Sequence, residues 1–363
     1  MFIEIAQDIF DEILNAGQNK LSALDVLEQL CYAYKYRKHI VFIEHINTTL
    51  IEQLHACCGD RKIIFHFLSQ LNHKKKDIKA LKNYLCITAL VTFKKDTSIE
   101  ANCIVINPNQ KPRFEFWEET HFLTENLSDS KFYKCIIKYY LRNYKIDNRT
   151  SFKFYPLNGG GGTTKDILQY EKDCEEHFCL VIADSDKKFH SGNNGQTANG
   201  ICNICNDTPF NCSFYILNNV SEIENLIPLG ILKMHSNTQQ KNFLDQGYDL
   251  SYYDIKEGKM YYRLFDDACY NYWRTILNGL DWSVIDQGRN TGDYELYKID
   301  VNNLSPLPNW GKTILNDIIN DSHNFLLYEN VNINDLSTNQ RIEWEHLGQL
   351  IYSWTCCSSG MRL

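Results

Sequence analysis

Apolar residues in the first hundred positions recur every three or four residues, the spacing of one helix face. The pattern covers Ile5 to Leu14, Leu24 to Tyr34 and Leu50 to Cys57. One short apolar run, His39 to Ile43, is typical of an isolated strand instead. Residues 1–113 are therefore predicted to form a mainly helical N-terminal region, and no motif in it indicates a role.

From about residue 103 the pattern changes, and short apolar runs alternate with helical patterns. The runs typical of strands are Cys103–Ile106, Phe114–Trp117, His121–Thr124, Phe152–Tyr155, Phe178–Ala183 and Phe214–Leu217. The helical patterns cover Ser128–Asn143 and Lys165–His177. Strands that alternate with helices favour a mostly parallel sheet with helices on both faces. The run Phe178–Ala183 is apolar throughout, as expected for a strand buried on both sides.

After residue 230 the sequence becomes helical and aromatic again. Helices are predicted at Asp266–Leu277 and Gln340–Thr355, and a strand pair or extended segment at Tyr252–Tyr262. The predicted fold class is therefore α/β: a central, mostly parallel sheet in residues 114–230, flanked by mainly helical N- and C-terminal regions. Residues 231–363 are expected to form an α-rich extension that packs on the sheet.

Composition and charge restrict the classes of function. The 363 residues are 44% hydrophobic and 23% charged, which is typical of a globular chain of two or three domains. The net charge of −8 argues against a protein that coats nucleic acid, since such a protein would be basic. It does not exclude an enzyme that binds nucleic acid through metal cations, because bound cations reverse the sign of the local electrostatic field.

The chain carries no signal for secretion or membrane insertion. Met1 leads directly into an acidic amphipathic segment, and no apolar run reaches the roughly 20 residues needed to span a bilayer. The fourteen cysteines are scattered, as in reduced cytoplasmic proteins, so a cytoplasmic location is predicted. The cysteines at 202, 205 and 212, with His190, lack the second cysteine pair of a structural zinc site, so no such zinc is predicted.

Acidic residues follow three of the predicted strands. Glu125 follows the strand His121–Thr124, with Asp129 in the next helix. Asp184 and Asp186 follow the strand Phe178–Ala183, and Glu222 and Glu224 follow the strand Phe214–Leu217. The carboxyl ends of parallel strands meet at one edge of a sheet, so these carboxylates are predicted to converge there. Mg²⁺ and Mn²⁺ prefer such oxygen ligands. Two ions about 4 Å apart can clamp both oxygens of a phosphoryl displacement.

These segments resemble TOPRIM motifs. Phe122–Ser130 is similar to the first motif, although Asn126 stands where glycine is usual, and Val181–Asp186 is similar to the second. Val220–Leu226 resembles the acidic segment of TOPRIM nucleases in OLD-like and related phage-defence proteins. The resemblance covers about a third of the chain. No ABC-type ATPase sequence accompanies it, so the similarity is to stand-alone TOPRIM effectors with a TOPRIM-like, Rossmannoid catalytic domain at 114–230.

The resemblance also implies roles for individual residues. Glu125 and Asp184 would hold metal, with Asp129 and Asp186 completing the shell. One of Glu222 and Glu224 would join them, and Glu224 is preferred as the ligand. A lysine would support the site; Lys256, beside a glycine turn, is preferred over Lys233.

The function implied is Mg²⁺- or Mn²⁺-dependent endonuclease cleavage of DNA or RNA, as the effector of a bacterial anti-phage system. The sequence leaves open an activating protein partner and an oligomeric state. Two alternatives stand beside it: a non-catalytic module that binds nucleic acid or a partner, and a primase-like TOPRIM enzyme. The glycine run Gly159–Gly162 fits either a loop that contacts nucleic-acid phosphate or a plain strand-to-helix turn.

Overall fold

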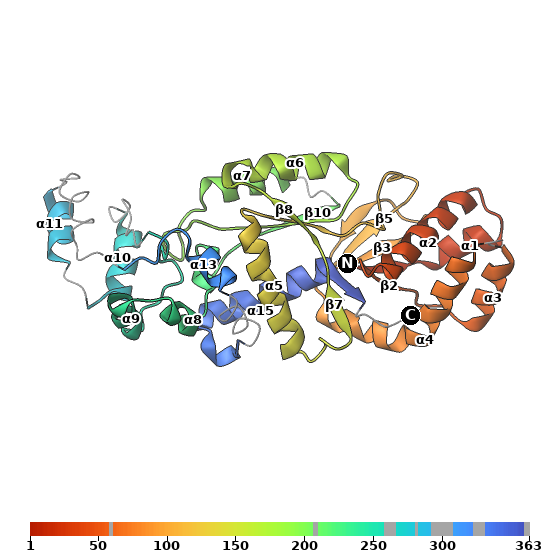
Figure 1. Cartoon of the computed structure of the whole chain (residues 1–363). Helices are drawn as coiled ribbons and strands as arrows, with labels where there is room; N and C mark the ends of the chain where they lie inside the picture. The colour runs from red at the N-terminus through yellow and green to blue at the C-terminus, as the bar shows by residue number, and fades with distance from the viewer. Residues whose placement is uncertain are drawn as a thin grey trace. The chain divides into compact units, whose positions relative to one another are not determined.

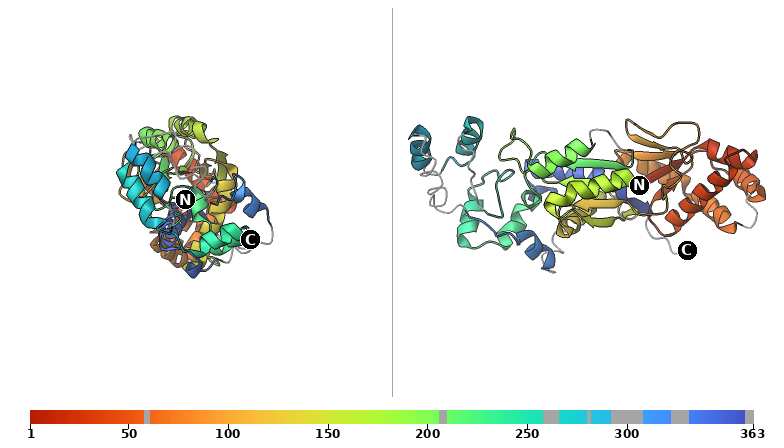
Figure 2. Two further views of the ribbon diagram at one scale, coloured as in Figure 1. Left: turned by 90° about the vertical axis from the view of Figure 1, so that its left-hand side faces the viewer. Right: turned by 90° about the horizontal axis from the view of Figure 1, so that it is seen from above.

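The structure is a computed structural model that describes residues 1–57, 61–205, 210–257, 266–279, 282–291, 308–321 and 331–358 (Figure 1, Figure 2). The described residues divide into two compact units. Unit 1 is drawn from Met1–Ile182, Ile201–Tyr215 and His346–Leu363, and unit 2 from Ala183–Gly200 and Ile216–Glu345.

Unit 1 begins with a sheet that the sequence pattern did not predict. Its five strands lie in the order β2-β1-β3-β5-β4, and all neighbours are parallel except β4 and β5. The strands are β1 (Phe2–Ile5), β2 (Ile40–Phe42), β3 (Thr88–Val91), β4 (Ser98–Glu100) and β5 (Cys103–Ile106). The helices are α1 (Gln7–Leu14), α2 (Lys20–Lys35), α3 (Thr48–Cys57) and α4 (Lys62–Leu81), grouped beside β2 in Figure 1.

The N-terminal region contains more helix than strand, as predicted, but the prediction lacked β1, β3 and β4. β1 and α1 are separated by a single residue, so the apolar residues of a buried strand run without a break into those of a helix face. The predicted helical pattern therefore begins at Ile5, and the strand before it is missed. The predicted strands at His39–Ile43 and Cys103–Ile106 are present as β2 and β5.

The central sheet of unit 1 has four strands in the order β10-β9-β6-β8. They are β6 (His121–Thr124), β8 (Tyr155–Asn158), β9 (Cys179–Ala183) and β10 (Cys212–Ile216), and β6 is parallel to both β8 and β9. Three helices lie between them in the chain: α5 (Leu127–Asn143), α6 (Thr164–Cys174) and α7 (Gln196–Cys205). A short 3₁₀ turn, η2 (Gly161–Thr163), precedes α6.

The strand order reverses between β6 and β9. The chain leaves β6 through α5 to β8 on one side, and returns through α6 to β9 on the other. Right-handed crossovers in opposite directions place their helices on opposite faces of a sheet. Figure 1 shows α5 and α6 on opposite faces. The predicted α/β class with a mostly parallel central sheet is thus confirmed, and β9 is buried along its whole length, as its apolar run predicted.

Two other strand predictions need correction. Phe114 and Phe116 are buried, but the backbone N–H groups of Glu115 and Phe116 bond to Glu176 and Gln29, and no strand forms there. The run Phe152–Tyr155 is divided between two sheets. Its first part belongs to β7 (Thr150–Phe152), which pairs with β11 (Cys356–Ser358), and its last residue begins β8.

Unit 2 is built from helices and turns. They are η3 (Ile223–Leu226), α8 (Leu229–Met234), α9 (Thr238–Asp245), α10 (Asp267–Ile276), α11 (Ser283–Thr291), α13 (Ile314–Asn320), η4 (Ile333–Asp335) and the first part of α15 (Thr338–Thr355). The helices predicted at Asp266–Leu277 and Gln340–Thr355 are confirmed. Residues 252–257 form turns where the sequence predicted strand or extended structure, and the rest of that prediction lies outside the described residues.

Helix α15 fixes the loop that leads from β10 to the acidic segment. Glu343 is fully buried and accepts hydrogen bonds from the backbone N–H groups of Asn218 and Asn219, at 3.1 and 3.3 Å. The neighbouring Trp344 donates from its indole to the carbonyl of Leu226 at 3.0 Å. The chain from 218 to 226 is thereby held at both ends. Among the described helices, none combines the length and the apolar character needed to cross a membrane.

Candidate functional site

The acidic segment after β9 is joined to the segment after β10 by backbone hydrogen bonds within unit 2. The N–H groups of Ser185 and Asp186 both donate to the carbonyl of Ser221, at 2.9 and 3.1 Å. The buried carboxylate of Asp184 accepts the N–H of Ile223 through Oδ1 at 2.9 Å. Two acidic segments that are nearly forty residues apart in sequence therefore lie side by side.

Asp186 adopts the left-handed backbone conformation, with φ of +53°. Aspartate tolerates this region better than most residues. Gly195 lies directly against it: a Cβ at position 195 would come within 2.6 Å of the Asp186 Cβ, and the Gly195 N–H donates to the Ser185 carbonyl at 2.7 Å. The turn that carries Asp186 is therefore fixed by a close backbone approach that requires glycine.

Lys256 binds both glutamates of the second acidic segment. Its Nζ lies 3.1 Å from Oε2 of Glu222 and 3.3 Å from Oε2 of Glu224. The two carboxylates are buried, and 30% of the lysine side chain is exposed. With Asp184 they form what we call the acidic cluster: Asp184, Glu222, Glu224 and Lys256. The other lysine that the sequence offered, Lys233, pairs with Asp245 at 2.6 Å on the surface of α8 and α9.

The pKa values of Glu222 and Lys256 are both raised, for different reasons. Burial raises the pKa of Glu222 to about 7, since the attraction of Lys256 offsets only part of the cost of desolvation. Burial lowers the pKa of Lys256, but attraction to Glu224, Glu222 and Asp184 outweighs it, so the pKa of Lys256 is raised well above its ordinary value. One lysine thus does not compensate three carboxylates.

A buried asparagine brings the lysine segment to the glutamates. Asn225 accepts the N–H of Glu222 at 2.8 Å and donates to the carbonyls of Leu250 and Tyr253, at 2.7 and 2.8 Å. The carbonyl of Lys256 also accepts the N–H of Gly311 at 3.1 Å. Apart from the contact with Glu222, these hydrogen bonds join residues 25 to 55 positions apart, which explains why sequence spacing alone left two lysines open.

The raised pKa of Glu222 predicts a pH-dependent stability of the metal-free protein. The folded chain keeps this proton up to about pH 7, whereas the unfolded chain releases it near pH 4.5, so the free energy of unfolding falls as pH rises through that window. The difference is up to about 3 kcal/mol. Urea unfolding in the presence of a chelator, from pH 5 to 8, should show this fall in the wild type but not in Glu222→Gln. Parallel curves for the two proteins would contradict it.

The first predicted motif lies in unit 1, where Glu125 follows β6 directly. Asn126 is extended, with φ of −133°, so its side chain fits where the motif usually has glycine. It begins α5 as the N-cap, and its N–H donates to Oδ2 of Asp129 at 2.8 Å. This is a capping box, which stabilises the start of a helix without metal. Asp129 therefore has a structural role that the motif did not indicate.

The glycine run passes beside the end of β6. The N–H of Gly159 donates to the carbonyl of Thr124 at 2.7 Å, and that of Gly160 to the carbonyl of Glu125 at 2.8 Å. Gly160 and Gly161 both have φ of +65°, a conformation that glycine adopts readily. The loop thus fixes the backbone of Glu125. Both interpretations of the run, phosphate contact and plain turn, remain compatible with this geometry.

The close approach at Gly159 predicts a contrast between two glycines of the run. A Cβ at Gly159 would lie 2.9 Å from the Thr124 carbonyl oxygen and against Thr164, whereas a Cβ at Gly162 would meet nothing within 4 Å. We expect Gly159→Ala to lower the free energy of unfolding by about 1–3 kcal/mol. Gly162→Ala should change it by less than about 0.5 kcal/mol. Urea titration of the three proteins measures the difference, and equal midpoints would contradict the close approach.

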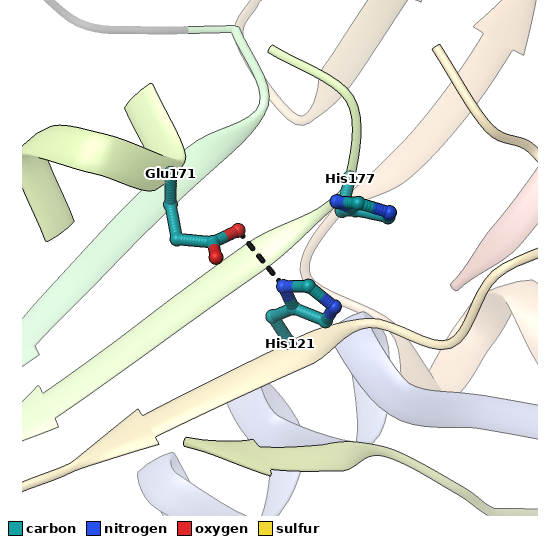
Figure 3. A group of neighbouring side chains, drawn as sticks. All are labelled: His121, Glu171 and His177. Atoms are coloured by element: carbon teal, nitrogen blue, oxygen red, sulfur yellow. Dashed lines mark hydrogen bonds and ion pairs between the residues drawn. The ribbon is translucent and has the colours of Figure 1, made fainter. Parts of the chain in front are cut away.

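A second cluster, which the sequence analysis missed, lies at the opposite ends of the strands in unit 1. It consists of His121 at the start of β6, Glu171 on α6 and His177 before β9 (Figure 3). In the part of the chain that the structure describes, it is the one group of three or more His, Cys, Asp or Glu whose ligand atoms all lie within 4.8 Å of one another. The three residues are distant in sequence and form no motif, so only an expected sheet order could have brought them together.

The cysteines form no such group among the described residues. Cys212 interacts with Cys179 of β9, and this contact and burial raise the pKa of the Cys179 thiol well above its ordinary value. Burial raises the pKa of Cys205 to about 12. The thiols of Cys179 and Cys205 are thus held in the protonated form. Every cysteine that the structure describes is free of disulfide bonds.

Comparisons of the chain with protein-family models, with curated proteins and with solved structures found no match. The TOPRIM resemblance therefore stays a prediction from the three sequence segments.

Proposed function

We propose that the protein is a Mg²⁺- or Mn²⁺-dependent nuclease of the TOPRIM kind that hydrolyses phosphodiester bonds of DNA or RNA. The observation that carries this proposal is the acidic cluster, in which Asp184, Glu222 and Glu224 gather around Lys256. The TOPRIM resemblance adds Glu125, Asp129 and Asp186 as further ligands, and we propose these three on their motifs.

The donor set of the cluster suits a hard divalent cation. All its candidate ligand atoms are carboxylate oxygens, which Mg²⁺ and Mn²⁺ prefer. The raised pKa of Glu222 reflects a buried carboxyl whose negative charge Lys256 only partly offsets. The described carboxylates do not form a set within 4.8 Å of one another, so binding an ion requires them to move closer together. A divalent cation supplies the positive charge that would draw them in.

When bound, the ion would stabilise charge on the phosphoryl oxygens and activate the attacking water. The chain's own contribution is to hold the oxygens and one cation in place. Lys256 keeps its proton across the physiological range because the carboxylates raise its pKa. It is partly exposed, so its ammonium can reach a phosphate that enters from solvent. A fixed positive charge there stabilises the transition state without reorganisation.

The test is a cleavage assay with purified full-length protein in Mg²⁺ or Mn²⁺, against supercoiled plasmid, single-stranded DNA and tRNA. The expected result is cleavage of at least one substrate that stops on chelation. No cleavage, together with no binding of Mn²⁺ at Asp184, would favour the non-catalytic binding module instead. Nucleotide polymerisation on a single-stranded template without cleavage would favour the primase-like alternative.

The resemblance to phage-defence TOPRIM proteins extends the proposal to the biological setting. We propose that cleavage of nucleic acid serves as the toxic step of a bacterial anti-phage system. Expression of the wild-type chain during phage challenge should reduce phage yield, and Asp184→Asn should abolish the reduction. Equal protection by both proteins would contradict this role.

A further inference from the structure

We propose that His121, Glu171 and His177 form a second metal site, specific for one divalent transition-metal ion of the Zn²⁺ class. The site uses none of the residues of the acidic cluster. It therefore does not depend on the proposed nuclease function, and its ligands favour a different kind of metal.

The ligand atoms of the three side chains lie within 4.8 Å of one another, close enough for one ion to bind all three. His121 Nδ1 lies 2.8 Å from Oε2 of Glu171, and the His121 and His177 rings stack at a centroid distance of 4.3 Å (Figure 3). Glu171 is buried, while 17% and 19% of the two histidine side chains remain exposed. The cluster is thus anchored by a buried carboxylate and open to solvent on the imidazole side.

The chemistry of the ligands selects the metal. Two imidazoles and one carboxylate suit Zn²⁺ and related transition ions, whereas Mg²⁺ prefers an all-oxygen shell. Three protein ligands leave a fourth position for water in a tetrahedral shell. Glu115 lies with Oε2 3.4 Å from Nε2 of His177, which is the place of an outer carboxylate that orients a ligating histidine.

The backbone around the cluster is fixed independently of the three side chains. Asn211 is fully buried. Its side-chain amide donates to the carbonyls of Glu171 and His177, at 3.0 and 3.2 Å. The N–H of Glu115 donates to the carbonyl of Glu176 at 2.8 Å. An ion here would tie the start of β6, helix α6 and the segment before β9 together, so we infer that its effect is to stabilise unit 1.

The experiment is a titration of the full-length protein with Co²⁺ in excess Mg²⁺, which occupies oxygen-only sites. We expect one equivalent of Co²⁺ with the visible absorption of a nitrogen- and oxygen-ligated ion. His177→Gln and Glu171→Gln should each weaken binding at least a hundredfold, and Glu115→Gln about tenfold. The matched control His45→Gln, an exposed histidine of unit 1, should bind like the wild type, as should Asp184→Asn.

Zn²⁺ should also raise the melting temperature of the wild type and of Asp184→Asn, and leave that of His177→Gln unchanged. X-ray absorption of the Zn²⁺-loaded wild type counts the imidazole ligands directly, so the proposal is decided even if a variant does not fold. Two imidazoles support it. Fewer than two imidazole ligands would overturn it. So would a thiolate charge-transfer band in the Co²⁺ spectrum, or equal Co²⁺ binding by the wild type and His177→Gln.

Discussion

Asp184→Asn is expected to reduce metal-dependent phosphodiester cleavage by about a thousandfold or more. Loss of one central ligand removes several kcal/mol of transition-state stabilisation, and each 1.36 kcal/mol is about a factor of ten in rate. Asparagine keeps the size of the side chain, and its Oδ1 can still accept the N–H of Ile223 that Asp184 accepts at 2.9 Å. The fold of the two acidic segments should therefore survive while the charge is lost.

The matched control is Asp245→Asn, which removes an exposed carboxylate that pairs with Lys233 in the same unit. Cleavage by wild type, Asp184→Asn and Asp245→Asn should be compared at saturating Mn²⁺ with circular dichroism as a check on folding. The control should retain wild-type activity. Undiminished cleavage by a folded Asp184→Asn protein would remove Asp184 from the site.

Lys256→Gln is expected to lower kcat by about a hundred- to a thousandfold, the effect of removing one donor that stabilises transition-state charge. Mn²⁺ affinity should rise at the same time. The Lys256 ammonium lies 3.1 and 3.3 Å from two carboxylates, so it competes with the metal ion for them. A fall in kcat together with a tighter metal Kd distinguishes a catalytic cation from an ordinary ion pair.

If the cluster were only a structural ion pair, the pattern would differ. Breaking a buried pair by removing one partner is strongly destabilising, and no divalent ion would restore the loss. On our account, Lys256→Gln lowers the free energy of unfolding in chelator, and Mg²⁺ restores it. Lys233→Gln serves as the control, because its partner Asp245 is exposed and surface pairs contribute little. Destabilisation that Mg²⁺ leaves unchanged would favour the structural interpretation.

The sequence predicted β6, β9 and β10 of the central sheet because these strands are short apolar runs separated by clear helical patterns, whereas β8 is largely exposed and was not predicted as such. β9 is the best example, since a run of five buried residues has no helical alternative at that length. The N-terminal sheet was missed for the converse reason. β1 leads into α1 after one residue, so a strand and a helix share one apolar pattern.

The candidate site was predicted in part, for similar physical reasons. Strand-end position alone indicated Asp184, Glu222 and Glu224, and the structure places these in contact with one another's segments. The choice of lysine depended on tertiary contacts through Asn225 that no spacing reveals. The capping role of Asp129 was equally hidden, because a capping box and a metal motif use the same acidic residue at the start of a helix.

The histidine cluster shows the limit of motif-based prediction. His121 begins β6, and His177 lies just before β9, the parallel strand beside β6, while Glu171 lies on α6, the helix that connects β8 to β9. Without the strand order, nothing in the sequence relates these residues. With it, residues at the amino ends of adjacent strands become neighbours, as the acidic residues do at the carboxyl ends.

The most direct test of the central claim is a crystal structure of the full-length protein soaked in Mn²⁺, with anomalous scattering used to locate the ions. The account predicts an anomalous peak about 2.1 Å from an Asp184 oxygen and from an oxygen of Glu222 or Glu224, with Lys256 drawn away from that glutamate. The contradicting result is no peak at Asp184 while Lys256 keeps its contacts of 3.1 and 3.3 Å to both glutamates.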